Sequence, residues 1–215
     1  GEPIQMNDLS LDLRRQIARG NDTPAFDYTT SDGRDAYLRL YSLPTFDAGG
    51  WHLTNSSVQS GPLTAPPGLS EGTPRKVSVT VTGLRSEWLP APYAPVSTTA
   101  GDRWGFLPDS LAILALGIAD RKSATVGMKY TVDSLDARPT PEQLAAAEAA
   151  PPPDADITAS VPSDISPTLV RLAGQITGGA KTPGAKVQAI LKYLASPGFS
   201  YTLDAAPGSG YAGLE

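Results

Sequence analysis

The sequence SPTLVRLAGQITGGAKTPGAKVQAILKYLASPGFSYTL, residues 166–203, contains two helix starts of the same design. In each, a hydroxyl-bearing residue precedes a proline, at Ser166-Pro167 and at Thr182-Pro183. The hydroxyl oxygen can accept a hydrogen bond from the first turn of the helix. Proline suits the first helical position because the N–H that it lacks would be unpaired there anyway. The stretch therefore predicts two consecutive short helices.

Apolar residues recur at intervals of three and four after each cap, which gives each helix one apolar stripe. The stripes comprise Leu169, Leu172, Ala173 and Ile176 in the first helix, and Val187, Ile190, Leu191 and Leu194 in the second. Gly178-Gly179 ends the first helix and Ser196-Pro197-Gly198 ends the second. Phe199, Tyr201 and Leu203 then alternate with polar residues, so we expect a short strand.

The first 150 residues show strand patterns with no long helical segment between them. We expect strands at residues 25–30, 36–42, 77–82, 111–119 and 124–132. Ser31-Asp32-Gly33 is a natural turn between the first two. In the second strand, Leu38 and Leu40 should face the core and Arg39 the solvent. In the last, one face should carry Val126, Met128, Tyr130 and Val132. Without helices for parallel crossovers, the sheets should be antiparallel.

Proline, glycine and small polar residues divide the chain further. Residues 55–74 hold few apolar side chains and predict a long exposed loop. Three prolines between residues 90 and 95 favour an extended edge or loop over a central strand. Thr140-Pro141-Glu142-Gln143 is a capping box that should open a short helix reaching Ala150, and the prolines at 151–153 should end it.

These patterns predict an α+β fold. A mainly antiparallel, β-sandwich-like domain should occupy residues 1–150. A linker of proline, alanine and aspartate should follow at residues 151–164, and the two-helix-plus-strand segment at residues 165–215.

Composition excludes several functions. The net charge of −5, with no long run of Lys or Arg, argues against nucleic acid as a partner. The chain has no cysteine and one histidine, so it cannot form a thiolate or multi-histidine metal site or supply a thiol nucleophile. We therefore predict neither a metal nor a cofactor.

The longest apolar run, residues 111–119, is too short to span a bilayer. With no signal peptide or initial methionine visible, we expect an excised segment, and Leu214-Glu215 could be native or a cloning remnant.

Catalytic side chains are not apparent. His52 is the only histidine, and no G-x-S-x-G motif accompanies it, so we expect a surface or turn residue rather than a member of a Ser-His-Asp triad. Asp32 and Asp35 flank a turn, and Asp154 and Asp156 lie in the proline-rich linker. Solvated turn acids are the favoured interpretation over acid–base catalysts or calcium ligands.

Four aromatic residues near turns and prolines form a candidate binding surface: Trp51, Trp88, Tyr93 and Trp104. Aromatic rings presented on loops can stack on sugars or hold a proline-rich peptide. The alternative is that they fill the ends of a β-sandwich, and this alternative is favoured because most large aromatic residues of a small β-domain belong to its core.

Three stretches carry a family resemblance: YLRLYSLPTFDAGGW (37–51), VTGLRSEWLPAPYAPVS (81–97) and the helix–helix–strand run that ends in FSYTLDAAPGSGYAGLE (199–215). They resemble the extracytoplasmic segment of bacterial TgpA-type, membrane-anchored transglutaminase-like proteins. The resemblance implies a cysteine, a histidine and an aspartate that follow beyond residue 215. No catalytic residue is therefore assigned within this chain.

The resemblance implies a non-catalytic N-terminal portion that scaffolds and positions a downstream catalytic core on the extracytoplasmic side of a membrane. Its partners would be that core and the membrane segments of the parent protein. Two alternatives remain open. One is a module that binds an envelope peptide, glycan or protein through the loop at residues 55–74 or the aromatic–proline segment at residues 88–93, and the other is an inert spacer. The apolar stripes could also support a homodimer through residues 166–203, since an exposed apolar surface favours self-association.

Overall fold

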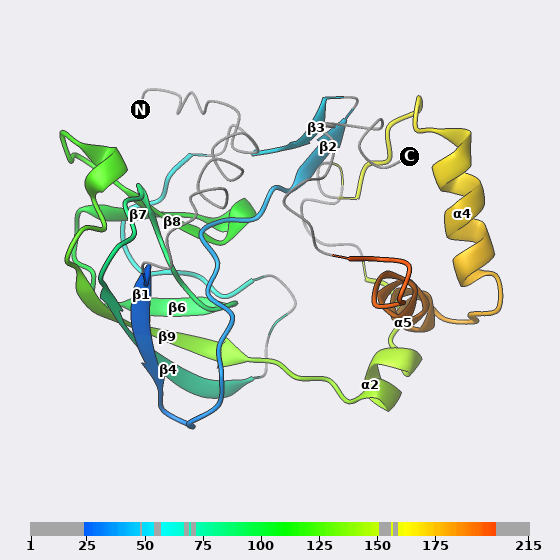
Figure 1. The fold of residues 1–215 in the computed structure, drawn as a ribbon, viewed down its shortest axis with the longest axis horizontal. Helices are drawn as coiled ribbons and strands as arrows, with labels where there is room; N and C mark the ends of the chain where they lie inside the picture. The colour runs from blue at the N-terminus through cyan, green and yellow to red at the C-terminus, as the bar shows by residue number, and fades with distance from the viewer. Residues whose placement is uncertain are drawn as a thin grey trace. The chain divides into compact units, whose positions relative to one another are not determined.

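The computed structural model describes residues 24–47, 49–53, 57–66, 69, 72–150, 156 and 159–200. These residues form two units, one of residues 24–44 and 53–137, the other of residues 45–52 and 138–200. The α+β fold predicted from the sequence is confirmed, because antiparallel sheets precede three short helices (Figure 1). The expected strand positions 201–203 and most of the expected linker (151–155, 157 and 158) lie outside the described residues.

The first unit contains two antiparallel sheets. The four-stranded sheet has the order β1-β4-β9-β6, with β1 at Phe26–Thr30, β4 at Thr73–Val81, β9 at Lys129–Asp136 and β6 at Pro95–Thr98. The three-stranded sheet has the order β5-β8-β7, with β5 at Trp88–Leu89, β8 at Ala112–Ala115 and β7 at Trp104–Leu107. Short 3-10 helices η1 and η2 span Pro108–Ser110 and Arg121–Ser123.

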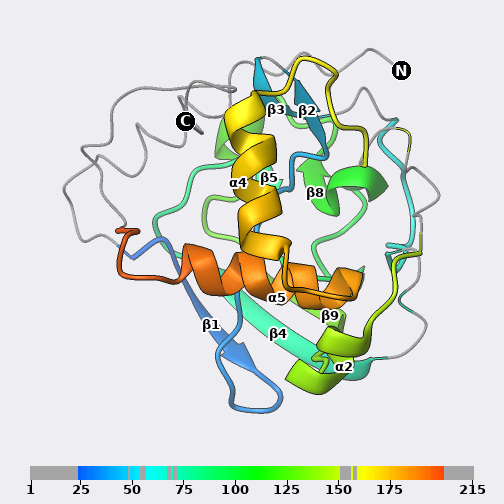
Figure 2. The ribbon, with the colours of Figure 1, turned by 90° about the vertical axis from the view of Figure 1, so that its right-hand side faces the viewer.

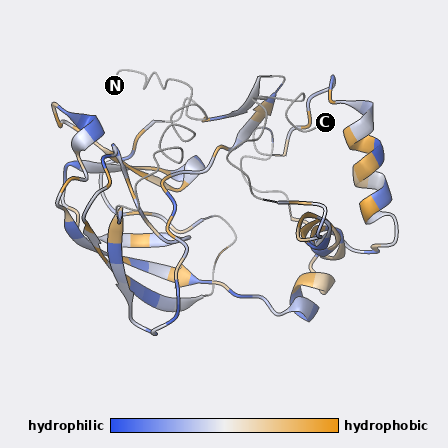
Figure 3. Ribbon diagram, viewed as in Figure 1, coloured by the Kyte–Doolittle hydropathy of each residue, from blue (hydrophilic) through white to orange (hydrophobic). Residues whose placement is uncertain are grey.

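Burial differs between the two sheets. In β4 of the larger sheet, Val77, Val79 and Val81 are buried and most of their neighbours are less so, as expected for a strand with one face toward the core. In the smaller sheet every residue of β5, β7 and β8 is buried, so both faces of this sheet are covered. The bands of contrasting hydropathy along the strands are visible in Figure 3.

One hydrophobic core joins the two sheets. Val77, Val79 and Val132 from the larger sheet form a single cluster with Phe106 and Ile113 from the smaller one. Complete burial of such side chains contributes roughly 1.5–3 kcal/mol each. Shared burial between two sheets is the defining feature of a β-sandwich-like domain.

Three strand predictions were wrong in extent or place. Residues 36–42 form only an isolated bridge, between Arg39 and Ala91. The predicted strand at 111–119 is limited to β8, because Leu111 is left-handed (φ 48°) and Gly117 has a φ of 59°. The strand predicted at 124–132 begins only at Lys129, after η2 and a turn.

The predicted shared face of that last strand is also wrong. Tyr130 and Val132 are buried, but Val126 lies in the turn and is more than half exposed. Arg39, expected to face solvent, is half-buried. Proline did confine β5 and β6 to sheet edges, as predicted. The loop at 57–66 is mostly exposed, with Val58 and Leu63 packed on the core clusters.

The second unit contains a hairpin and three helices. The hairpin pairs β2, Thr45–Asp47, with β3, Gly50–His52. The helices are α2 at Pro141–Ala146, α4 at Pro167–Thr177 and α5 at Pro183–Leu194. The capping box at Thr140 is confirmed, although the helix ends at Ala146 rather than at Ala150.

Both N-caps predicted in the stretch 166–203 are confirmed. The Ser166 hydroxyl accepts a hydrogen bond from the Thr168 N–H, and the Thr182 hydroxyl accepts one from the Ala185 N–H. Phe199 and Ser200, which follow α5, are not in a strand.

Helices α2 and α5 are in close backbone contact near the start of α5 (Figure 2). The Gly184 N–H donates to the Ala147 carbonyl at 3.1 Å, and the Gln188 side chain donates to the Pro141 carbonyl at 2.6 Å. A Cβ atom on Gly184 would lie only 1.7 Å from the Leu144 carbonyl oxygen. Glycine is therefore required where α5 meets α2.

Candidate functional site

The structure distributes the four candidate aromatic residues among different environments. Trp88 and Trp104 are buried, with exposed fractions of 4% and 7%, whereas Trp51 and Tyr93 are 56% and 47% exposed. Trp51 packs on Phe46 in the β2–β3 hairpin, with ring centroids 4.8 Å apart. Trp88, Tyr93 and Trp104 belong to the first unit. They lie in three different environments there and do not form one surface.

Trp88 takes part in a second core cluster. Its ring lies 5.2 Å from that of Tyr41, in a tilted arrangement typical of aromatic pairs. Leu107 and Leu114 complete the packing around it. Trp88 is therefore a core residue and not part of a binding surface.

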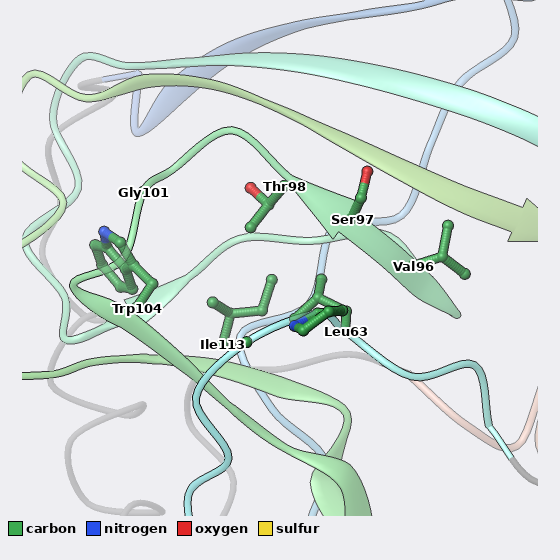
Figure 4. A pocket seen from close by; sticks show the side chains of 9 residues that line it. Leu63, Val96, Ser97, Thr98, Gly101, Trp104 and Ile113 are labelled. Carbon is green, nitrogen blue, oxygen red and sulfur yellow. The ribbon is translucent and has the colours of Figure 1, made fainter.

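Trp104 forms one wall of a pocket of about 270 Å³. The pocket lies among β6, β7, β8 and the loop at residues 61–63, and Figure 4 shows Trp104, Ile113 and Leu63 around a shared space. Its remaining lining consists of Gly61, Pro62, Val96, Ser97, Thr98 and Gly101.

The pocket loop is held against β7 by backbone pairing. Gln59 and Phe106 exchange two hydrogen bonds, each 2.8 Å long. Gly105 permits this approach, since a Cβ atom there would meet Val58 at 2.4 Å. The sequence missed Leu63 and Ile113 as lining residues, because a small-residue loop and an apolar strand carry no local signal that they will meet.

The lining suits an uncharged group. None of the lining residues is charged, and the two hydroxyl groups make hydrogen bonds within the protein. Ser97 donates to the Asp133 carboxylate at 2.8 Å, and Thr98 donates to the Thr131 carbonyl at 3.0 Å. The pocket can thus accept an apolar or weakly polar group by contact, without an ionic partner.

His52 lies in the hairpin of the second unit, where its Nε2 atom is 2.7 Å from the Asp47 carboxylate. The Gly49 N–H donates to the same carboxylate oxygen at 2.7 Å. These two hydrogen bonds, the one from His52 first, lower the pKa of Asp47. Both side chains are substantially exposed, so the pair fastens the β2–β3 turn and lacks the enclosed setting that general-base catalysis favours.

Asp32, in the turn after β1, forms ion pairs with two arginines: Arg34 in the same turn and Arg75 in β4. It contacts the exposed Arg34 at 2.6 Å and the buried Arg75 at 3.0 Å. Arg75 also donates to the carbonyl groups of Arg34 and Asp35. Burial alone would raise the pKa of Asp32, but the hydrogen bonds from Arg34 and Arg75 hold it well below its usual range. Asp32 is therefore a structural turn acid, not a proton donor at neutral pH.

The described residues show neither a metal-binding cluster nor a membrane-spanning helix. They contain no cluster of three or more His, Cys, Asp or Glu side chains placed to hold a metal ion. Within the same ranges, no helix combines the length and apolar character needed to cross a bilayer.

The fold and the pocket define the class of protein: a β-sandwich-like domain with a helical extension and an uncharged pocket. The chain belongs to the TgpA N-terminal domain family, whose model matches residues 2–141. No curated protein matches the chain.

Two solved structures share the fold. One is the periplasmic domain of TgpA from Pseudomonas aeruginosa bound to ethylmercury, with a TM-score of 0.56 and 17% identity over 94% of this chain and 66% of that one. The other is the periplasmic domain of the same protein, with a TM-score of 0.55 and 18% identity over 93% of this chain and 64% of that one. This chain thus spans about two thirds of their length.

Proposed function

We propose that this chain is the non-catalytic N-terminal portion of an extracytoplasmic, membrane-anchored transglutaminase-like protein, and that it scaffolds and positions the downstream catalytic core. Family membership and the likeness to a periplasmic domain support the location. The match covers 66% and 64% of the two solved chains, so each contains further residues that could form such a core.

The observation that carries the scaffolding role is the apolar stripe of α5. Val187, Leu191 and Leu194 are each about half exposed, and Ile190 is 37% exposed. A contiguous exposed apolar face on a helix is typical of a surface that packs against another one. The downstream core is the proposed cover, and its docking would fix its position relative to the β-domain.

The chemistry of the parent protein would reside in that core. The family resemblance implies a cysteine thiolate that attacks an amide carbonyl, forms a thioester and releases the amine. Water or a second amine would then resolve the thioester. This chain has no cysteine, so its contribution would be positional.

The test uses the longer polypeptide that continues past Glu215 through the implied cysteine, histidine and aspartate. Amine release from peptide amides and labelling by a thiol-directed electrophile are measured alongside hydrogen exchange in α5. Leu191→Glu should increase exchange in α5 and lower the rate of amine release, because it places a charge on the covered face. Lys192→Glu, at the next and exposed position, is the matched control and should leave both unchanged. Equal behaviour of the two variants, or the absence of a reactive thiol, contradicts the proposal.

A second candidate function is favoured by the pocket at Trp104. The uncharged lining suits a neutral side chain of an envelope peptide. N-acetylprolinamide and N-acetylleucinamide are suitable probes, because both lack charge. Binding in the pocket should change tryptophan emission in the wild-type chain and not in Trp104→Phe. An unchanged emission with both probes would remove this candidate.

A further inference from the structure

Arg39 carries a positive charge that none of the described carboxylates neutralises. Among the residues that the structure describes, no Asp or Glu oxygen lies within ion-pair distance of its guanidinium. Its Nη1 atom donates to the Ser42 hydroxyl at 3.2 Å, while its Nη2 atom is shielded from solvent and has no hydrogen-bond acceptor in the described part of the chain. Withdrawing a guanidinium from water is unfavourable unless its donors are paired, so this arrangement needs an explanation.

Two other arginines of the same unit have anionic partners. The buried Arg75 contacts Asp32 at 3.0 Å, and Arg121, whose side chain is 36% exposed, contacts Glu87 at 3.1 Å. Arg121 also has shielded nitrogen atoms without a hydrogen-bond acceptor among the described residues, but the Glu87 carboxylate neutralises its charge. Burial lowers the pKa of Arg39, and only an electrostatic interaction with Tyr93 opposes this effect. An arginine nevertheless stays protonated at neutral pH, so the charge persists.

The backbone holds Arg39 and Tyr93 in a fixed relation. Arg39 and Ala91 exchange two backbone hydrogen bonds, of 2.8 and 2.9 Å. The guanidinium carbon lies over the Tyr93 ring, 5.0 Å from its centroid. The next residue, Ala94, is fully buried with a φ of 53°, a left-handed conformation that non-glycine residues rarely adopt. The chain thus turns directly after Tyr93, whose ring is half-exposed.

We propose that Arg39 and Tyr93 form a binding site for the carboxylate of a small ligand whose apolar portion contacts the Tyr93 ring. The planar guanidinium matches a carboxylate through two parallel hydrogen bonds, which a lone ammonium group cannot provide. A polyphosphate or nucleic acid is disfavoured, because such ligands need several cations together and this chain carries a net charge of −5.

The contacts that now hold the guanidinium are weak enough to yield to a ligand. They consist of one neutral hydroxyl and one aromatic face, and neither matches a charge-assisted pair. A rotation of the side chain over the ring would release Nη2 toward a bound carboxylate. Tyr37, two residues earlier and 96% exposed, offers a second ring in the same segment.

The experiment compares two probes that differ only in charge. N-acetylphenylalanine carries a terminal carboxylate, and N-acetylphenylalaninamide is its neutral counterpart. Each is titrated at millimolar concentrations into the isotope-labelled full chain, with the Arg39 side-chain Nε–Hε signal and the Arg39 and Ala91 amides as reporters. The acid should shift these signals with at least about tenfold higher affinity than the amide.

Variants locate the site. Arg39→Gln should abolish the response to the acid at the Ala91 amide, whereas Arg103→Gln, at an exposed arginine of the same unit, should preserve it. Tyr93→Leu keeps the charge, removes the ring and should weaken binding several-fold, which provides a second test should Arg39→Gln fail to fold. Near-ultraviolet circular dichroism reports the folding of each variant.

Two further outcomes are decisive. A parallel titration with N-acetylglutamic acid α-amide, which carries only a side-chain carboxylate, shows whether the site prefers a chain terminus or an acidic side chain, and either preference supports it. Equal responses to the acid and the amide, a response that survives in Arg39→Gln, or no response to any carboxylate would overturn the proposal. None of these outcomes depends on a downstream catalytic core.

Discussion

Replacement of Gly184 by alanine should separate α5 from α2. The added Cβ atom would lie 1.7 Å from the Leu144 carbonyl oxygen and 3.1 Å from the Ala147 Cβ atom, and the first of these approaches is far inside the 3.0 Å that real Cβ contacts respect. The obstacle is backbone, so it cannot move aside as a flexible side chain would. One of the two helices has to shift.

The cost follows from the hydrogen bonds that such a shift breaks. Thr182 donates to the Ala145 carbonyl, Gly184 to Ala147, and Gln188 to Pro141. Each contributes about 1 kcal/mol net, and the higher helix propensity of alanine returns roughly 0.5–1 kcal/mol. The variant should therefore lose about 1–2.5 kcal/mol in the local stability of α2 and α5. Hydrogen exchange of their amides should accelerate by roughly 5- to 70-fold.

Gly174→Ala is the matched control. Gly174 lies within α4, and nothing lies within 4 Å of the Cβ atom that alanine would add. This change should slow exchange in α4 a few-fold, because alanine favours a helix interior by roughly 0.5–1 kcal/mol. If Gly184→Ala left exchange in α2 and α5 at the wild-type rate while Gly174→Ala behaved as expected, the close approach of the two helices would be refuted.

Three further predictions concern single side chains. Asp32 has a lowered pKa in the folded protein, so the stability it contributes is present above the ordinary aspartate range near pH 4 and is lost as the pH falls below it. Urea titrations from pH 7 to pH 3 should therefore show a steeper loss for the wild type than for Asp32→Asn, which leaves Arg75 without its carboxylate at every pH. Tyr130→Phe should lower the free energy of unfolding by roughly 1 kcal/mol, because the buried Tyr130 hydroxyl donates to the Pro90 carbonyl at 2.7 Å. An unchanged midpoint of urea unfolding would show that this hydrogen bond does not stabilise the fold. Iodide should quench mainly the emission of the exposed Trp51, and Trp51→Phe should remove most of the quenchable fraction.

The helices were predictable because their signals are local. A cap, a proline and a stop lie within a few residues of each other, and Ser166 and Thr182 cap α4 and α5 as the sequence indicates. The valines of β4 alternate over a stretch long enough to fix the buried face. Fold class followed from these patterns, since strands without intervening long helices are restricted to antiparallel pairing.

The strand predicted at 124–132 failed because its first half is held by distant partners. Thr125 is fully buried, and its hydroxyl donates to the Leu84 carbonyl and accepts from the Ser86 N–H, about forty residues away. These bonds keep the segment in turns, and Gly127 adds a positive φ of 68°. Periodicity cannot reveal a constraint that lies so far along the chain.

The surroundings of two arginines were hidden from the sequence for the same reason. Arg75 and Arg39 both occur in apparently alternating segments, yet Arg75 finds Asp32 across 43 positions, whereas Arg39 finds no carboxylate among the described residues. A single bridge to Ala91, not a continuous strand, sets the direction of Arg39, so alternation wrongly predicted that it faces solvent. An unpaired charge becomes apparent only when every neighbouring acceptor is known. The Arg39–Tyr93 site is therefore an inference that three-dimensional contacts permit and that composition, motif and periodicity do not.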